Sequence, residues 1–391
     1  MSVKDQILAT ADEYRSEALE ADKLNQLSDA TVARMKEQQV IRMLQPAEYG
    51  GLEVGPREFA ETVMTLAALH PSAGWVAGVV GVHPWQLALG TKEVQDEVWG
   101  EDPDTWIASP YMPNGLAIRV EGGYRMSGRW SFSSGTDHCR WLYLGAMKCD
   151  EEGNMVMPPQ MLHVNLPRSD YEIVPDSWDV VGLLGTGSKD IVVKDAFIPD
   201  HRLMAYDDVV EGVQWREMGV EKILYQLPWS MMFPLGISAA TIGIAQGLYD
   251  QIKDYQRDRV GAEGNVIKDD PIVMYHLGRS GAQLRAAREA ILSNAQEIYD
   301  IVAAGEEVSF ARRAEGRRNQ VDAVWTAVRA VDDAYARCGG TALRNDSMMQ
   351  KYWRDMQAGL HHAIHVATTP YQAAALSELG FEPQGPLRAM I

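Results

Sequence analysis

The stretch GRWSFSSGTDHCRW, residues 128–141, joins two large aromatic side chains to a row of hydroxyls. Trp130 and Phe132 alternate with polar residues, so we expect a strand that points both aromatics to one apolar face. Small residues follow, and they allow a backbone to come close to a flat ligand with a polar edge. They are Ser133, Ser134 and Gly135. An ordinary strand end with a Ser-Gly turn is the alternative interpretation.

Several histidines stand where acid-base chemistry is possible, because an imidazole shares protons near neutral pH. His83 lies in the apolar run VVGVHPWQL. A histidine there is usually a hydrogen-bonded core residue, but it can also meet a buried ligand. His361 and His365 have the i, i+4 spacing that can hold a metal on one helix face. No third ligand accompanies them, so we expect no metal site.

Two further stretches could line a pocket. Ser109 lies in IASPYMP at an expected helix-to-strand boundary, where an ordinary turn serine is the alternative. Residues 224–236, LYQLPWSMMFPLG, are rich in Trp, Met and Phe. Such a run is typical of a protein core or of the wall of an apolar substrate pocket.

Composition excludes several classes of function. The chain of 391 residues has a formal net charge of −18, and nucleic-acid binding needs a basic surface, so we expect no nucleic-acid partner. Three cysteines without metal-binding or redox spacing favour a reducing, cytoplasmic compartment. The charged N-terminus lacks the apolar region of a signal peptide, and no run reaches the ~20 apolar residues of a membrane helix. No GxGxxG follows a predicted strand, and no GxxxxGK[ST] occurs.

Three composition regimes follow one another along the chain. Residues 1–104 have helical spacing, residues 105–210 have short alternating runs with turns, and residues 211–391 are helical again. We therefore expect an N-terminal helical domain, a middle β-domain with a hairpin at Gly122-Gly123, and a C-terminal helical bundle.

One bundle helix is predicted with particular clarity. Asp270 and Pro271 form a helix start, with Asp as the cap and Pro in the first turn. Apolar residues then recur every seven positions, which is the pattern of a helix seam in a bundle. They are Leu277, Leu284, Ile291 and Ile298.

Four motifs together resemble the acyl-CoA dehydrogenase superfamily and span nearly the whole chain. They are QPAEYGG at 45–51, GRWSFSSG at 128–135, GLLGTGSKDIVVKDAFIP at 182–199 and GGTAL…YWRD within 339–355. The resemblance implies the α+β, mainly α, fold of that superfamily, with a helical N-terminal domain, a β-barrel-like middle domain and a C-terminal four-helix bundle. It also implies a homotetramer.

The expected catalytic base of the dehydrogenases is missing. In most members it is a Glu shortly after the RD of the last motif, but here WRDMQAGLHHAIHVATT follows and no Glu or Asp occurs between Asp355 and Glu378. Histidines stand there instead. In this respect the chain resembles the oxygenase components of two-component flavin monooxygenases, which include hydroxylases of a seco-steroid phenol and of para-hydroxyphenylacetate.

That resemblance implies roles for individual residues. It implies a phenol-binding His83, a phenol-contacting Ser109 and a catalytic His362, and it places Ser134 at N5 of the flavin. Which histidine acts as base stays open. The other residues assigned to flavin binding are Trp130, Ser133, Gly135, Thr186, Ser188, Arg257 and Arg259. The two arginines suit a phosphate site or a charged helix end equally well.

The function implied by the resemblance is ortho-hydroxylation of a phenol, with an apolar polycyclic phenol as the favoured substrate. Reduced FMN or FADH2, supplied by a separate NAD(P)H-dependent reductase, reacts with O2 to a C4a-hydroperoxide that transfers OH. A serine at N5 and a dry surround suppress loss of H2O2. A histidine shares the phenolic proton, whose pKa is about 10. The alternatives are an acyl-CoA dehydrogenase, an N- or S-oxygenase of the same fold, and a scaffold without flavin.

Overall fold

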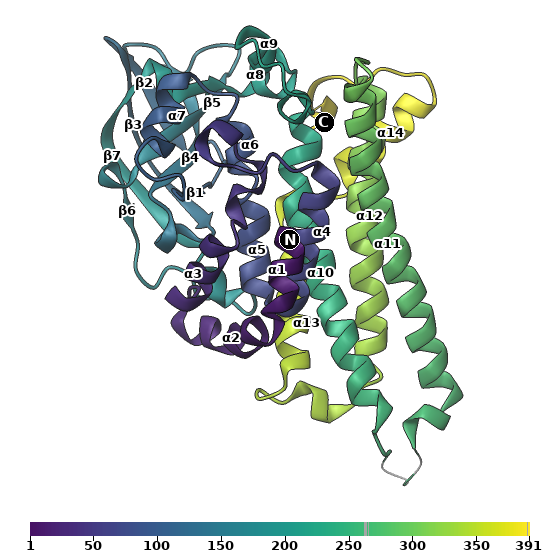
Figure 1. Cartoon of the computed structure of the whole chain (residues 1–391). Coiled ribbons are helices and arrows are strands. Elements are labelled where there is room, and N and C mark those ends of the chain that lie inside the picture. Colours follow the sequence, from purple (N-terminus) through teal and green to yellow (C-terminus); the bar gives the residue numbers. More distant parts are fainter. Residues whose placement is uncertain (262–263, 265, 389) are drawn as a thin grey trace.

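The N-terminal helices lie between a sheet on one side and a bundle of long helices on the other (Figure 1). The computed structural model describes residues 1–391 except 262–263, 265 and 389. The N-terminal helices are α1 (Val3–Ala9), α2 (Ala11–Leu24), α3 (Asp29–Glu37), α4 (Pro56–Leu69), α5 (Pro71–Val80), α6 (His83–Leu87) and α7 (Lys92–Trp99). The apolar run around His83 is buried as predicted, but it is divided between α5 and α6.

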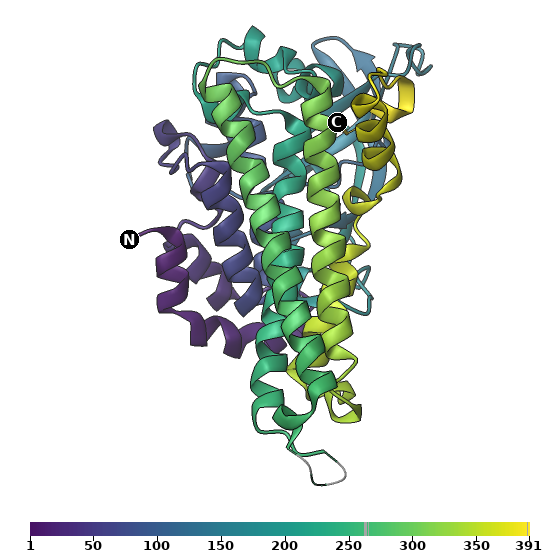
Figure 2. The same cartoon turned by 90° about the vertical axis from the view of Figure 1, so that its right-hand side faces the viewer.

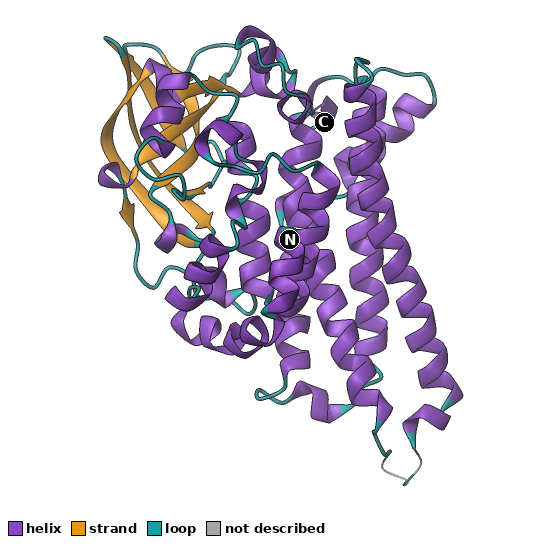
Figure 3. Cartoon of the chain, in the orientation of Figure 1, coloured by secondary structure: helices purple, strands orange, loops and turns teal. Residues whose placement is uncertain are grey.

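The middle of the chain forms an eight-stranded sheet, shown in orange in Figure 3. Its strands are β1 (Ile107–Ala108), β2 (Gly115–Val120), β3 (Gly123–Ser133), β4 (Trp141–Cys149), β5 (Met161–Pro167), β6 (Glu172–Ile173), β7 (Lys189–Pro199) and β8 (Leu203–Ala205). The hydrogen-bonded order is β6-β7-β3-β2-β4-β5-β8, and β1 pairs with β4. The predicted hairpin is formed, since β2 and β3 pair antiparallel up to Val120 opposite Gly123.

Strand β3 does not carry both aromatics on one face. Its pairing with β7 is irregular between Trp130 and Ser133, and Phe132 has a φ of 68°, in the left-handed region. Trp130 is fully buried, and its indole N–H donates to the carbonyls of Met112 and Gly145 at 3.0 and 2.9 Å. Phe132 is 67% exposed. The predicted alternation is wrong at Phe132, because the irregularity turns this residue out of the strand register.

The C-terminal part contains the bundle. Its helices are α8 (Tyr206–Val210), α9 (Val213–Glu217), α10 (Trp229–Arg257), α11 (Pro271–Ala303), α12 (Phe310–Tyr335), α13 (Met348–Leu360) and α14 (Thr368–Glu378). Helices α10, α11 and α12 run side by side (Figure 2). The predicted start of α11 is confirmed, because the Asp270 carboxylate accepts the amide N–H groups of Ile272 and Val273. The seven-residue seam packs inward, with Leu277 partly buried and the other three residues fully so.

Helix α10 links the N-terminal helices to the bundle. It packs against α4 and α5 on one side and against α12 and α13 on the other. A Cβ at Gly78 of α5 would overlap the carbonyl of Gly236 in α10, and a Cβ at Gly236 would overlap the carbonyl of Gly78. The two helices therefore cross backbone to backbone. By length and composition alone α10 could cross a membrane, but its most apolar window is 94% buried inside the protein.

A buried ammonium joins α2, α13 and the loop before β7. Lys351 has a fully buried side chain, and its Nζ donates to Asp355 Oδ2 at 2.7 Å and to Asp22 Oδ1 at 2.8 Å. The same carboxylates accept the backbone N–H groups of Leu183 at 2.6 Å and Gly185 at 3.3 Å. Although burial opposes the charge, the two carboxylates raise the pKa of Lys351. The charged Lys351 and its two carboxylates therefore fix the loop before β7, which joins β6 to β7.

We expect the substitution Lys351→Met to lower the free energy of unfolding by about 3–5 kcal/mol, because it leaves two carboxylates without their cation. Urea denaturation followed by circular dichroism measures this change. The matched control is Lys23→Met on the exposed face of α2, expected within about 0.5 kcal/mol of the parent. A Lys351→Met protein as stable as the parent would mean that the ammonium does not stabilise the fold.

Candidate functional site

A cavity of about 500 Å³ lies where the N-terminal helices, the sheet loops and the bundle meet. Its apolar lining comes chiefly from Trp75, Val79, Phe132, Trp178, Phe233 and Ile237. Its polar side chains are Ser109, Ser134, Ser188, Gln357, His361 and His362. The structure therefore brings together four of the residues to which the family resemblance assigns a catalytic or flavin-binding role: Ser109, Ser134, Ser188 and His362.

A row of hydroxyls leads from the cavity into the protein. Ser134 Oγ lies 2.8 Å from Ser188 Oγ, which lies 2.7 Å from Thr186 Oγ1. Thr186 donates to the Leu183 carbonyl at 2.7 Å. Each hydroxyl has one proton, so Ser188 must donate to Thr186 and Ser134 must donate to Ser188. Ser134 Oγ also accepts the indole N–H of Trp75 at 3.2 Å, which leaves one lone pair for a ligand that is a donor.

The backbone around these hydroxyls is held by its own hydrogen bonds. Gly135 has a φ of 72°, and its N–H donates to the Thr186 carbonyl at 2.8 Å. Leu183 has a φ of 57°, and its N–H donates to Asp355. A left-handed leucine is unusual and requires such support. The serines of the cavity are thus tied to the buried ammonium through the loop that carries Leu183 and Thr186.

His83 and Ser109 form a second hydrogen-bonded unit. His83 Nδ1 contacts the Ile107 carbonyl, and its Nε2 lies 2.5 Å from Ser109 Oγ. A carbonyl only accepts, so the ring proton is on Nδ1 and Ser109 donates to Nε2. Burial lowers the pKa of His83 to about 4, so the ring is neutral. Ser109 lines the cavity and His83 does not, so within this unit only Ser109 faces a ligand in the cavity directly.

His362 follows the C-terminal end of α13. Its Nδ1 accepts the Ile364 amide N–H at 3.3 Å, which places the proton of the neutral ring on Nε2. Burial lowers the pKa of His362 to about 4. In the part of the chain that the structure describes, this Nε2 has no hydrogen-bond partner, so it can donate to a ligand oxygen in the cavity.

The helical i, i+4 geometry considered for His361 and His365 is not formed, because α13 ends at Leu360. His361 is exposed. His365 is buried, and its two ring nitrogens contact the Gly359 carbonyl at 3.0 Å and Ser238 Oγ at 3.2 Å. These two histidines therefore do not face a common ligand.

Other residues assigned to the flavin lie outside the cavity lining. The Trp130 ring is buried in the sheet against Gly115 and Gly128 and does not line the cavity, and its assignment to flavin binding stays a prediction. Ser133 is fully buried with no hydrogen-bond partner among the described residues. Gly135 and Thr186 do not line the cavity but hold the two serines that do: the Gly135 N–H donates to the Thr186 carbonyl, and Thr186 Oγ1 accepts from Ser188.

The two arginines are not brought to the cavity within one chain. Arg257 is the last residue of α10, about 30 Å along the helix axis from Ile237. It pairs with Asp254 at 2.6 Å, and Arg259 donates to the Arg337 carbonyl at 2.7 Å.

Phe132 is the one residue of the apolar lining that was predicted individually from the sequence. Phe233 belongs to the Trp- and Met-rich run that was considered as core or as a pocket wall; it lines the cavity, whereas Trp229 does not. Trp75 and Trp178 carried no signal of their own, because apolar residues of a core and of a cavity wall look alike in sequence.

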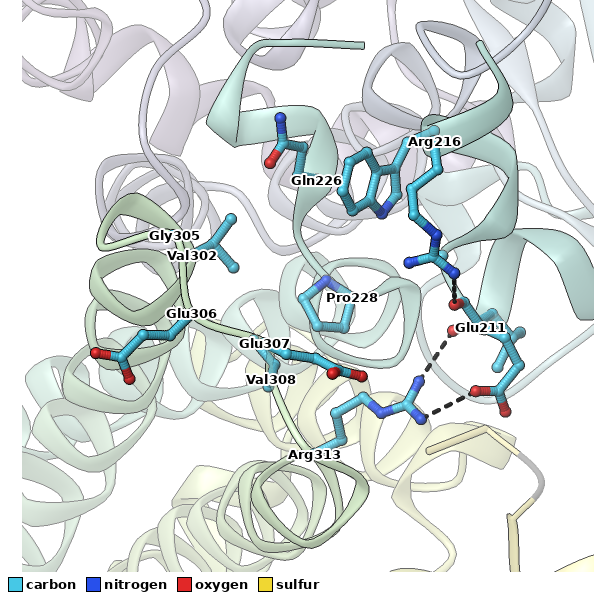
Figure 4. A pocket seen from close by; sticks show the side chains of 13 residues that line it. Glu211, Arg216, Gln226, Pro228, Val302, Gly305, Glu306, Glu307, Val308 and Arg313 are labelled. Carbon is cyan, nitrogen blue, oxygen red and sulfur yellow. Dashed lines mark hydrogen bonds and ion pairs between the residues drawn. The ribbon is translucent and has the colours of Figure 1, made fainter. Parts of the chain in front are cut away.

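A second cavity, of about 340 Å³, is charged (Figure 4). In it Arg313 donates to Glu211 Oε2 at 3.2 Å, and Arg216 donates to the Glu211 carbonyl at 3.0 Å. None of the residues assigned from the sequence to catalysis or to flavin binding lines this cavity, although Gln226 and Pro228 of the Trp- and Met-rich run do. The cavity that contains Ser109, Ser134 and His362 is therefore the candidate active site.

Comparisons with known proteins agree with the fold described above. Residues 235–367, about a third of the chain, match the family model described as acyl-CoA dehydrogenase, C-terminal domain. A pigment production hydroxylase from Rhodococcus erythropolis is 58% identical over 389 residues, which is 100% of this chain and 99% of that protein.

Two further relatives carry more specific names. The oxygenase subunit HsaA of a flavin-dependent monooxygenase from Mycobacterium tuberculosis is 38% identical, over 95% of this chain and 93% of that protein. The crystal structure of the M. tuberculosis HsaA monooxygenase has a TM-score of 0.92 to this structure, covering 100% of this chain and 99% of that one at 37% identity. The oxygenase component of p-hydroxyphenylacetate 3-hydroxylase from Acinetobacter baumannii is 32% identical, over 98% of this chain and 90% of that protein.

We expect stability to fall as the pH drops from 7.5 to 5.5, because buried histidines stay neutral in the fold. Burial lowers the pKa of His83 and His362 to about 4, and of His70, His163 and His365 to about 3. The unfolded chain takes up these protons near pH ~6.5, so each histidine removes up to about 1.4 kcal/mol per pH unit below that value. Urea midpoints at both pH values measure the change. Equal midpoints would contradict the neutral histidines.

Proposed function

Because the chain belongs to the oxygenase components of flavin-dependent two-component monooxygenases, we propose that it hydroxylates a phenol at the ortho carbon with reduced flavin and O2. The acyl-CoA dehydrogenase fold expected from the sequence is confirmed. The observation that carries the substrate proposal is the Ser109–His83 unit, which presents a hydroxyl oxygen backed by a neutral imidazole to an apolar cavity.

The cavity residues fit a reduced flavin ring. Its apolar walls suit a flat ring, and the free lone pair of Ser134 suits an N–H donor. N5 of a reduced flavin carries a hydrogen and N5 of an oxidised flavin does not, so the hydroxyl row favours the reduced form. The bound flavin would activate O2 and supply the oxygen atom. The apolar surround keeps water from the reacting centre.

Ser109 and His83 orient the substrate hydroxyl. Ser109 donates to His83 Nε2, so the oxygen of Ser109 can accept the phenolic O–H. A phenol has a pKa of about 10. His83 has a pKa lowered by burial to about 4, so complete transfer of the proton to His83 is uphill by about six pKa units. His83 is therefore a positioning residue that holds Ser109 as an acceptor and draws electron density toward the ring.

His362 contributes a donor from a different element. Its Nε2–H can donate to the oxygen atom that would be left with negative charge when the other oxygen atom of O2 is transferred to the ring. No Asp or Glu lines this cavity within the part of the chain that the structure describes, so the proton abstraction of an acyl-CoA dehydrogenase has no carboxylate base here. This composition favours the oxygenase over the dehydrogenase alternative.

The partner and assembly follow from the same proposal. An oxygenase component works with a separate reductase, which we propose to be an NAD(P)H-dependent supplier of FMNH2 or FADH2. Within one chain no Lys or Arg among the described residues lines the cavity, so a flavin phosphate must find its cations elsewhere. A homotetramer, in which another copy supplies them, is part of the proposal. A cytoplasmic location is also proposed, in keeping with three free buried cysteines.

The test of the function is product formation. Purified protein mixed anaerobically with FMNH2 or FADH2 and then with O2 and a phenol, 2-naphthol being the first choice, should yield the ortho-dihydroxy product. We expect Ser109→Ala to lower kcat/KM about 10- to 100-fold, because the phenolic hydroxyl loses its acceptor. Ser169→Ala, at an exposed position, is the control. Flavin that reoxidises with no product from any phenol would refute the function.

The direction of the hydroxyl row has its own test. We expect Ser188→Ala to let Ser134 turn its proton toward the flavin, so the preference for reduced over oxidised flavin should fall about tenfold. Ser134→Ala should leave less product and more H2O2 per flavin oxidised. Anaerobic titration with both redox forms and peroxide assays measure these effects. Ser131→Ala, exposed on the same strand, should change neither; an unchanged flavin preference in Ser188→Ala would contradict the deduced direction.

A further inference from the structure

The polar side chains that line the active-site cavity are hydroxyl, amide and imidazole groups. They are three serine hydroxyls, the Gln357 amide and two histidines. No Lys, Arg, Asp or Glu lines the cavity within the described part of the chain. Burial lowers the pKa of His362 to about 4, so this ring adds no positive charge at neutral pH.

Two cations of α13 lie beside this cavity, and both are engaged. Lys351 is enclosed by the carboxylates of Asp22 and Asp355. Arg354 donates to the Val181 carbonyl, and its Nε donates to Gln350 Oε1 at 2.7 Å. Lys351 is not available to a ligand without breaking a bond that holds the loop before β7, and Arg354 is anchored by two of its three nitrogens to Val181 and Gln350.

The walls make an unpaired charge costly. Trp75, Val79, Phe233 and Ile237 come from two helices that cross at the Gly78–Gly236 contact, and all four side chains are at least nine-tenths buried. An ionised carboxylate placed among them loses its water and gains no cation. An ester or a primary amide of the same shape has no such charge, and it can hydrogen-bond to a hydroxyl or to Gln357.

We propose that this cavity selects phenols that carry no charged group and excludes phenols that bear a carboxylate near the ring. The proposal deepens the proposed function and rests on it for the chemistry, but its selectivity is a property of binding. Under this proposal the substrate of this chain differs from p-hydroxyphenylacetate, the carboxylate-bearing phenol that appears in the name of one of its relatives.

The experiment compares 4-hydroxyphenylacetate with its methyl ester and its primary amide. Binding to the flavin-free protein is followed by tryptophan fluorescence, since Trp75 and Trp178 line the cavity. Turnover with reduced flavin and O2 is measured from the amount of ortho-hydroxylated product formed. We expect the ester and the amide to bind and to react with a kcat/KM about 100-fold or more above that of the acid.

A charge introduced at Gln357 is the matched test. Gln357 is half-buried at the end of α13, so a longer side chain is accommodated more easily there than on α10. We expect Gln357→Arg to raise the kcat/KM for the acid, relative to that for the ester measured in the same variant, at least tenfold. Gln357→Met removes the amide without adding charge and should not favour the acid.

The outcomes separate this inference from the function. If acid and ester bind and react equally well, the charge selectivity is wrong while the hydroxylase function stands. If the ester binds and the acid does not, but no phenol is hydroxylated, the selectivity stands and the function is wrong. If the acid binds more tightly than the ester, the inference is overturned whatever the activity.

Discussion

One buried ammonium holds together the parts of the protein that form the active-site cavity. Lys351 lies between the carboxylates of Asp22 and Asp355, and both carboxylates also accept backbone N–H groups of the loop before β7. Hydrogen bonds between charged groups are stronger and more directional than neutral ones, and burial keeps water from competing. A helix near the N-terminus, a loop of the sheet and a helix near the C-terminus are thereby fixed at one point.

A short series of neutral hydrogen bonds connects this fixed loop to the hydroxyl groups that face the cavity. The loop fixed by Asp355 presents the Leu183 carbonyl, which orients Thr186, and Thr186 orients Ser188 and Ser134 in turn. On another wall the Ile107 carbonyl orients His83, which orients Ser109. In both series a carbonyl that can only accept decides where the last hydroxyl sends its proton. The direction of the hydroxyl groups that face the cavity is thus set by two backbone carbonyls, those of Leu183 and Ile107.

Much of this arrangement follows from the sequence, and the rest depends on contacts that no local pattern contains. The hairpin at Gly122-Gly123 and the start of α11 are local, because turn residues and caps act within a few positions. Ser109, Ser134, Ser188 and His362 were found through a family resemblance. Their convergence needed the fold, since they come from segments up to about 250 residues apart.

The errors have physical causes as well. Trp130 and Phe132 alternate in sequence, but an irregular pairing with β7 sends one into the core and the other to the cavity mouth. An alternation with a period of two assumes a regular strand, and no residue type in this stretch predicts the irregular pairing. The fully buried Lys351 is also invisible to sequence reasoning, because lysine is normally a surface residue and its two partners lie on separate segments.

The contact between Gly78 and Gly236 limits how this cavity can be reshaped. Since α5 and α10 touch backbone to backbone, neither position accepts any side chain without forcing the helices apart. The residues that directly follow these glycines, Val79 and Ile237, point into the cavity lining and can change in size while the spacing of the helices stays constant. Variants selected for substrates with larger or smaller ring systems should therefore accumulate replacements beside the two glycines and keep the glycines themselves. The same crossing of α5 and α10 is thus compatible with many different substrates.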